Sequence, residues 1–225
     1  MNKGEFDFIQ ELLSGCNRME LPEPDDKILD TLFVYFTELK HWSRRINLIA
    51  KKATDREILE KHFLDSLTLL PLLAKTGSHL LDIGTGAGFP GLVCKAAKPD
   101  LQLTLVEPRL KRVSFLSHVT RKMELDDVRI LTCRAEDEDK LVSDGGYTHI
   151  TSRAVSEIRN ILAMSSRFVK PGVQVICMKG PKWEEELAAW QESGNSDFFY
   201  LCSRKEYTLP HFEGRRYLLI FEKVK

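Results

Sequence analysis

A run of alternating glycines behind an acidic residue is the pattern in this sequence best suited to binding a ligand. The run LLDIGTGAGFPG spans residues 80–91, so Asp82 stands two places before Gly84, and Gly86 and Gly88 follow at alternate positions. Glycines between a strand and a helix allow a tight turn and bring bare backbone N–H groups against a ligand. An acidic residue just ahead of them suits a ligand with a cationic amino group better than one with a pyrophosphate.

Two cofactors compete for such a loop. S-adenosylmethionine carries an ammonium and no phosphate, whereas a dinucleotide needs the spacing GxGxxG, which 86–91 also matches. That dinucleotide spacing begins late after the apolar run, and Phe89 takes the place of its third glycine when the pattern is counted from Gly84. Glu107 ends the next apolar run, where a carboxylate can accept hydrogen bonds from both ribose hydroxyls, each worth about 1.5–3 kcal/mol. Because both cofactors contain a ribose, Glu107 does not separate them, and a purely structural turn is the third alternative.

The end of the third apolar run offers a further contact. Ala135 and Glu136 follow VRILTC, residues 128–133, and are placed to meet the edge of an adenine. The alternative is that Glu136 only begins a helix, where its charge would favour the helix dipole. Both interpretations stay open.

The elements that must position these residues follow from the hydrophobic periodicity. A helix is predicted over 25–41, and another over 54–73 with Thr54 as its N-cap and Ile58, Leu59, Phe63, Leu67 and Leu70 facing inward. Short apolar runs separated by helical stretches then indicate parallel strands, and the last two runs an antiparallel closing pair. The five parallel runs span 80–83, 101–107, 128–133, 147–152 and 173–179, and the closing pair spans 197–209 and 215–224. The predicted class is α/β, with an N-terminal helical extension over 1–77 and a ligand-binding domain over 78–225.

Composition limits the classes of protein to which the chain can belong. The 225 residues include 33 Lys and Arg against 33 Asp and Glu, so the chain is neutral and no strongly basic balance points to nucleic acid. Five cysteines without a CxxC pair argue against a disulfide framework or a thiolate zinc site and favour a reducing cytoplasm. The acidic start and the absence of an apolar run of about 20 residues predict neither a signal peptide nor a membrane span.

One local stretch could still hold RNA. Residues 40–52, KHWSRRINLIAKK, contain five Lys or Arg and no acid, together with Trp42. Cations with an aromatic ring can pair phosphates and stack an exposed base, although a solvated helix face is the simpler explanation for any one of them. The candidates are Lys40, Trp42, Arg44, Arg45, Asn47, Lys51, Lys52, Arg109, Lys111, Arg112, Lys179 and Lys182. Lys111 and Arg112 could equally offset the charge of Glu107.

One histidine–carboxylate pair invites a metal-site interpretation. His62 and Asp65 lie three positions apart, on one face of the predicted helix. No third and fourth ligand stand at matching spacing, so we expect no metal here. A structural hydrogen bond or an RNA contact is the expected role.

Taken together, these motifs resemble one protein family. LLDIGTGAGFPG, VEPRLKRVSFL (106–116), CRAED (133–137), TSRA (151–154), MKG (178–180), INLIA (46–50) and KHFLDSL (61–67) are similar to the RsmG family, also called glucose-inhibited division protein B. The resemblance implies a class I methyltransferase (Rossmann-like) fold, with a mostly parallel seven-stranded sheet and an antiparallel closing strand. It also implies transfer of a methyl group from S-adenosylmethionine to N7 of a guanine in 16S rRNA of the small ribosomal subunit. Implied cofactor contacts are Gly84, Phe89, Ala135, Glu136 and Arg153.

The end of the fourth apolar run is where acceptor chemistry is expected. Thr151-Ser152-Arg153 stands there instead of an Asn/Asp-Pro-Pro-aromatic or Pro-Cys cluster, and arginine cannot act as a base. Guanine N7 has a lone pair and no proton to lose, so placement matters more than a base. Arg153 would orient the cofactor carboxylate or the guanine O6 edge, or else pair a structural carboxylate. The competing functions are an NAD(P)-dependent oxidoreductase and a non-catalytic RNA-binding module, and we expect a monomer.

Overall fold

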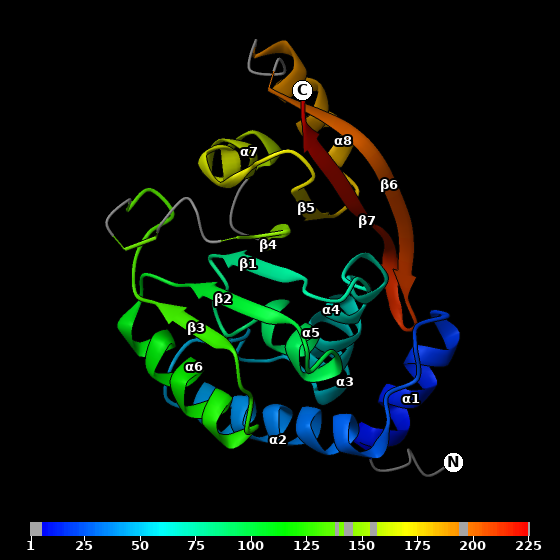
Figure 1. The fold of residues 1–225 in the computed structure, drawn as a ribbon. Helices are drawn as coiled ribbons and strands as arrows, with labels where there is room; N and C mark the ends of the chain where they lie inside the picture. The colour runs from blue at the N-terminus through cyan, green and yellow to red at the C-terminus, as the bar shows by residue number, and fades with distance from the viewer. Residues whose placement is uncertain (1–5, 138–139, 142–145, 154–156, 194–197, 225) are drawn as a thin grey trace.

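In the part of the chain that the structure describes, seven strands form one mixed sheet (Figure 1). The computed structural model describes residues 6–137, 140–141, 146–153, 157–193 and 198–224. The strand order is β3-β2-β1-β4-β5-β7-β6, with β1 to β5 parallel and β7 antiparallel to both β5 and β6. The strands are β1 (His79–Ile83), β2 (Gln102–Val106), β3 (Val128–Leu131), β4 (His149–Arg153), β5 (Gln174–Lys179), β6 (Phe199–Leu209) and β7 (Phe212–Lys223). The predicted fold class is confirmed.

Helices cover both faces of this sheet. Leu80 packs into the core shared with the N-terminal helices, whereas its neighbour Leu81 packs into the core on the side of α7 and α8. Successive strand residues point to opposite faces, so strands buried on both sides are apolar without interruption. One face carries α1 (Phe8–Arg18), α2 (Asp26–Ser43), α5 (Gly91–Ala97) and α6 (Leu110–Lys122); the other carries α7 (Ile158–Ser165), the short 3-10 helix η3 (Ser166–Phe168) and α8 (Trp183–Glu192).

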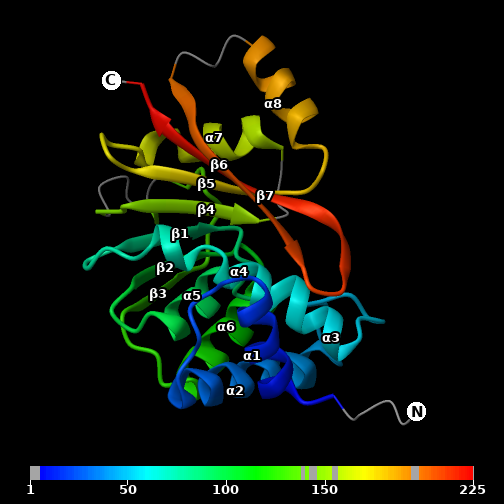
Figure 2. The ribbon, with the colours of Figure 1, turned by 90° about the vertical axis from the view of Figure 1, so that its right-hand side faces the viewer.

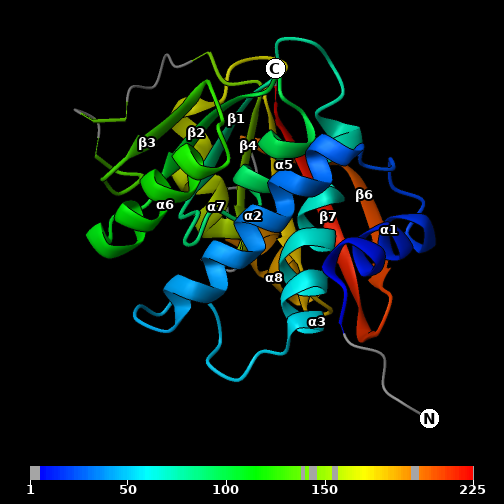
Figure 3. The same cartoon turned by 90° about the horizontal axis from the view of Figure 1, so that it is seen from below.

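Seen from below, the long helix α2 runs across the face of the sheet (Figure 3). The Asp25 carboxylate caps its first turn by accepting the Ile28 N–H at 2.8 Å. Leu32, Tyr35 and Leu39 are fully buried along one stripe, as their spacing predicts. The helix predicted over 25–41 is confirmed. None of the helices in the described ranges is long and apolar enough to cross a membrane.

The single helix predicted over 54–73 is wrong, because the segment changes its helical form several times. It consists of α3 (Asp55–Ile58), the π-helix η1 (Leu59–Leu64), α4 (Asp65–Leu67) and the 3-10 helix η2 (Leu70–Leu72). Thr54 is the N-cap as predicted, within a capping box with Glu57. Of the five residues predicted inward, four are buried, whereas Leu70 is partly exposed because the chain has already entered η2. Apolar spacing predicts a buried stripe but does not reveal a wider helical turn.

Aromatic rings join the N-terminal helices to the glycine loop. The Phe8 and Phe63 rings meet edge to face at 5.2 Å between centroids, and Tyr35 contacts Phe63 at 5.3 Å. Tyr35 then stacks on Phe89 of the loop at 5.0 Å. The described N-terminal helices and the sheet therefore share one hydrophobic core.

Candidate active site

The chain between β1 and α5 forms a loop in which three glycines take left-handed backbone angles. The angle φ is +69° at Gly84, +63° at Gly86 and +100° at Gly88. A Cβ atom at Gly88 would lie 2.6 Å from the Tyr35 hydroxyl and 2.5 Å from the Leu92 side chain, so another residue there must displace buried neighbours. The Tyr35 hydroxyl also donates a hydrogen bond to the carbonyl of Ala87. The loop is thus held from the N-terminal side of the molecule.

Asp82 braces the same loop from inside. Its Oδ2 accepts hydrogen bonds from the Thr85 hydroxyl at 2.7 Å and from the Gly91 N–H at 2.9 Å. The side chain is fully buried, and this burial raises the pKa of Asp82 to about 6. Its Oδ1 has no hydrogen-bond partner within the described residues. The geometry gives Asp82 a role in holding the loop, and its contact with a cationic ligand stays a prediction.

Glu107 ties the end of β2 to this loop. Its Oε2 accepts the N–H of Gly86 at 3.1 Å, and its Oε1 accepts the N–H of Arg109 at 2.9 Å. The Arg112 guanidinium lies 3.5 Å from Oε2, so the alternative in which Arg112 offsets this charge is confirmed. Only 2% of Glu107 is exposed. The structure therefore brings together the acidic residues and glycines that the sequence analysis singled out.

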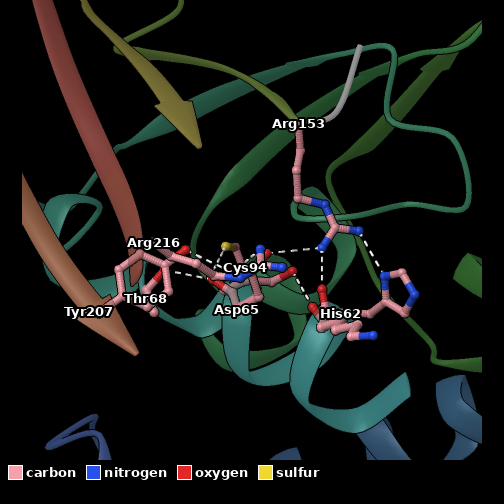
Figure 4. A network of polar contacts seen from close by, with 9 residues as sticks. His62, Asp65, Thr68, Cys94, Arg153, Tyr207 and Arg216 are labelled. Carbon is pink, nitrogen blue, oxygen red and sulfur yellow. Dashed lines mark hydrogen bonds and ion pairs between the residues drawn. The ribbon is translucent and has the colours of Figure 1, made fainter. Parts of the chain in front are cut away.

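Arg153, at the end of β4, reaches toward the N-terminal helices (Figure 4). Its Nη1 donates to the carbonyl of Lys61 at 2.6 Å and to Oδ2 of Asp65 at 3.2 Å, while Nη2 lies 3.0 Å from Nδ1 of His62. The guanidinium also lies 5.2 Å from the centroid of the Phe89 ring. The structural carboxylate considered as an alternative partner is present, and any contact of Arg153 with cofactor or guanine stays a prediction.

Asp65 is a buried junction that the sequence analysis did not recognise. Besides Arg153, its carboxylate accepts from the Tyr207 hydroxyl at 2.7 Å and from Arg216 at 2.9 Å (Figure 4). Asp65 has no exposed surface, and two guanidinium groups offset its charge. Burial, and after it the Asp65 carboxylate, raises the pKa of Tyr207. The available signal was a carboxylate among the apolar residues Phe63, Leu64 and Leu67 of KHFLDSL, since buried charges need partners.

His62 is held in its neutral form. Burial, followed by the nearby Arg153 and Arg216 charges, lowers the pKa of His62 to about 3. Its ring stacks on Phe89 with 4.9 Å between centroids. The structural hydrogen bond expected for His62 is present, and Asp65 is occupied by arginines. Across the residues that the structure describes, no three His, Cys, Asp or Glu side chains gather as metal ligands.

Beyond β3, the described chain forms a turn at the predicted adenine contacts. The carbonyl of Ala135 accepts a hydrogen bond from Arg167 at 2.6 Å, and Glu136 is exposed. Residues 138–139 and 142–145, where a helix started by this carboxylate would continue, lie outside the described residues, so that alternative stays open. The adenine contact of Ala135 and Glu136 stays a prediction.

A cleft of about 720 Å³ opens at the carboxyl ends of β4 and β5. Arg153 and Lys179 line it from the strand ends, with Gly180 and Pro181 beside them. Phe212 and the residues up to Arg216 line it from β7. In an open parallel sheet, ligands bind at this edge, so the cleft is the candidate acceptor site.

The predicted RNA-binding residues divide by their exposure. Those with exposed side chains are Arg44, Arg45, Asn47, Lys51, Lys52, Arg109, Lys111 and Lys182. The other four, Lys40, Trp42, Arg112 and Lys179, are partly buried. Lys40 pairs with Asp55 at 2.6 Å, Lys179 pairs with Glu186 at 2.7 Å, and Arg112 lies beside Glu107. Trp42 packs against Phe115 with 5.7 Å between ring centroids. The exposed set is the part of this prediction that is open to a polyanion without rearrangement.

Solved structures place the fold in a class. The precorrin-6y C5,15-methyltransferase of Geobacter metallireducens has a TM-score of 0.52 at 14% identity, covering 78% of this chain and 92% of that one. Geranyl diphosphate methyltransferase, solved in complex with S-adenosylmethionine, has a TM-score of 0.52 at 15% identity, covering 71% of this chain and 84% of that one. The strand order, the glycine loop and these likenesses define the class I methyltransferase fold.

Sequence comparisons narrow this class to one family. The model of the GidB family, described as rRNA small subunit methyltransferase G, matches residues 28–216. A protein of that name from Desulfotalea psychrophila is 50% identical, covering 96% of this chain and 98% of that protein; another from Syntrophus aciditrophicus is 36% identical, covering 88% and 83%. The chain therefore belongs to the rRNA small subunit methyltransferase G family, as its motifs predicted. These findings favour a methyltransferase over the oxidoreductase alternative.

Proposed function

We propose that this protein transfers a methyl group from S-adenosylmethionine to N7 of a guanine in the 16S rRNA of the small ribosomal subunit. The observation that carries the proposal is the meeting of the glycine loop with Glu107 at the carboxyl ends of β1 and β2, where an open parallel sheet binds its ligand. Membership of the family supports the RNA acceptor, because the relatives are named methyltransferases of the small-subunit RNA.

The residues present fit this cofactor. Glu107 is a buried carboxylate beside the bare backbone of Gly86, as a ribose diol next to the loop requires. A Cβ at Gly86 would meet only the flexible end of Arg112 at 3.7 Å and the Gly84 carbonyl at 4.0 Å, so the loop presents open backbone. The proposed contacts are Asp82, Gly84, Gly86, Gly88, Phe89, Glu107, Ala135, Glu136 and Arg153. S-adenosylmethionine supplies an electrophilic methyl group on its sulfonium.

The acceptor chemistry requires placement. Guanine N7 carries a lone pair without a proton, so the attack needs no general base, and positioning alone can contribute several kcal/mol. Arg153 suits a positioning role, because Asp65 and His62 hold its guanidinium at the end of β4. It would orient either the cofactor carboxylate or the guanine O6. An Arg153→Ala variant that folds, binds cofactor normally and retains full methyl transfer would contradict this role.

Exposed cations form the proposed contacts with RNA phosphates. Arg44, Arg45, Lys51 and Lys52 follow one another at the end of α2 and in the segment after it. The helices that follow this segment reach the strand ends, since Arg153 donates to the carbonyl of Lys61. We infer that these cations flank the edge that carries the cleft. Phosphate contacts of this kind bind RNA without reading its sequence.

We further infer that the protein acts as a monomer in the cytoplasm, with residues 1–77 as a helical extension of the S-adenosylmethionine-binding domain over 78–225. The stacked rings of Tyr35 and Phe89 support the proposal that residues 1–77 extend the cofactor-binding domain, because they join α2 to the glycine loop. Light scattering coupled to size-exclusion chromatography measures the mass that a 25.8 kDa monomer predicts. A dimer mass at micromolar concentration would contradict the monomer.

Three experiments test the function. Radiolabelled methyl groups from S-adenosylmethionine should appear in small-subunit rRNA, and rRNA from cells lacking the protein should have lost a 7-methylguanosine by mass spectrometry. Calorimetry should detect binding of S-adenosylhomocysteine and no binding of NAD. Unchanged methylation in the deleted cells would contradict the RNA acceptor, and cofactor binding without any transfer would favour a non-catalytic RNA-binding module.

A further inference from the structure

The β6–β7 hairpin projects past the end of its neighbour in the sheet. β5 ends at Lys179, which pairs with Tyr217, whereas β7 already begins at Phe212. Within the described residues, Phe212, Arg215 and Arg216 therefore pair with β6 only. At about 3.4 Å per residue, the five residues 212–216 overhang β5 by roughly 17 Å. Figure 2 shows the hairpin reaching toward α3. The overhang forms one wall of the cleft at the strand ends.

Buried acids of the N-terminal helices hold this overhang in place. The N–H of His211, at the hairpin turn, donates to Oε2 of Glu60 at 3.0 Å, and its ring contacts the other Glu60 oxygen. Glu60 is only 4% exposed. Tyr207 and Arg216, from the two strands, both donate to Asp65. The wall is therefore anchored on both strands and at its turn.

An exposed aromatic ring lies on this anchored wall. Phe212 directly follows His211, and 37% of its surface is exposed. The Lys61 ammonium lies 4.4 Å from its ring centroid and the Arg216 guanidinium 5.6 Å from it. Arg215, which lines the cleft, pairs with Glu206 at 3.2 Å, and its side chain is 68% exposed. An aromatic ring among cations, in a cleft of nucleotide size, has the composition of a site for single-stranded nucleic acid.

We propose that Phe212 is a stacking platform for a nucleobase of the RNA strand that enters the cleft, with Lys61 and Arg215 placed to meet its phosphates. The inference rests on the proposed function, which makes RNA the acceptor. Every base has a π face, so stacking tolerates any sequence, while the cations supply the charge complement. The Lys61 side chain is 31% exposed and pairs with Glu57 at the surface, so it can leave the ring when a base arrives.

The test compares Phe212→Ala and Phe212→Trp with the wild-type protein. Binding is measured on small ribosomal subunits, and on naked rRNA, from cells that lack the protein. Loss of the ring should weaken RNA binding about 10- to 100-fold, whereas tryptophan should restore binding because it stacks at least as well. Affinity for S-adenosylhomocysteine and the melting temperature should stay unchanged in both variants.

Tyr200→Ala is the matched control, since Tyr200 is an exposed aromatic residue of the same hairpin at 46% exposure that does not line the cleft. It should bind RNA like the wild type. Wild-type affinity in Phe212→Ala, or equal losses in the alanine and tryptophan variants, would overturn the stacking platform. Wild-type protein that binds the RNA without methylating it would contradict the proposed function alone.

Discussion

Among single residues, Glu107 is the one whose substitution best distinguishes an effect on cofactor binding from an effect on folding. Its carboxylate accepts two backbone N–H groups: that of Gly86, in the loop that would hold the cofactor, and that of Arg109, in the turn between β2 and α6. Glu107→Gln keeps the shape and removes the charge, so each bond to a ribose hydroxyl falls from about 1.5–3 kcal/mol, typical of a charged acceptor, to about 0.5–1.5 kcal/mol. We expect the affinity for S-adenosylhomocysteine to fall about 10- to 100-fold in calorimetry.

Asp126→Asn provides the control for this prediction, because Asp126 is an exposed carboxylate ahead of β3 at the opposite edge of the sheet. It should bind S-adenosylhomocysteine like the wild type. Equal affinity in Glu107→Gln and the wild type would remove Glu107 from the cofactor site.

The buried imidazole of His62 makes stability depend on pH. The pKa of His62 is about 3 in the folded protein against 6.5 ordinarily. Above pH 6.5 both states are neutral; as the pH falls below it, only the unfolded chain gains the proton, so the free energy of unfolding decreases. The loss attributable to His62 reaches about 2 kcal/mol at pH 5.

Urea unfolding of the wild type and of His62→Gln at pH 7 and pH 5 measures the part of this loss in unfolding free energy that is due to His62. The variant cannot take up the proton, so its stability should fall less between the two pH values. Identical losses in the two proteins would show that the imidazole titrates normally in the folded state.

At the scale of elements, Asp65 connects four segments: α4 carries it, and β4, β6 and β7 each donate to it. Asp65→Ala leaves two guanidinium groups and a hydroxyl without their partner. Breaking a buried pair in this way costs about 3–5 kcal/mol. We expect urea denaturation to show a loss of that size, together with weaker RNA binding, because Arg216 and the hairpin wall lose an anchor.

Asp55→Ala is the matched surface variant. Asp55 pairs with Lys40, but both side chains are more than a third exposed, and such pairs contribute about 0–1 kcal/mol. A loss of stability in Asp65→Ala no larger than that in Asp55→Ala would contradict the junction.

At the scale of the whole molecule, a neutral protein has to bind RNA through separated charge. Each phosphate neutralised on a single strand contributes about −0.7 to the slope of log affinity against log salt. Replacing Lys51 and Lys52 together by Gln should make that slope shallower by about 1.4. Filter binding of rRNA over a range of salt concentrations measures the slope.

Lys122→Gln is the corresponding control, because Lys122 is exposed at the far end of α6, away from the cleft. Its slope should change little. A slope that is the same in the double variant and the wild type would exclude the segment after α2 from the RNA interface.

Local patterns alone predicted the strands, the glycine loop, the Thr54 cap and the family, because each depends on residues close together in the chain. Apolar residues that repeat every two positions in a strand, or every 3.6 in a helix, fix which face is buried, and a glycine run marks where the backbone must turn. Asp82 and Glu107 could be paired in advance, since parallel strands bring their carboxyl ends to one edge.

Only the tertiary structure decided which polar groups meet across the fold. Asp65 finds its partners 88, 142 and 151 positions further along the chain, and the reach of the β6–β7 hairpin depends on its register with β5. Trp42, a candidate base platform, likewise packs on the distant residue Phe115. Side-chain pairing at such separations is set by how the layers pack, and no local period in the sequence encodes it.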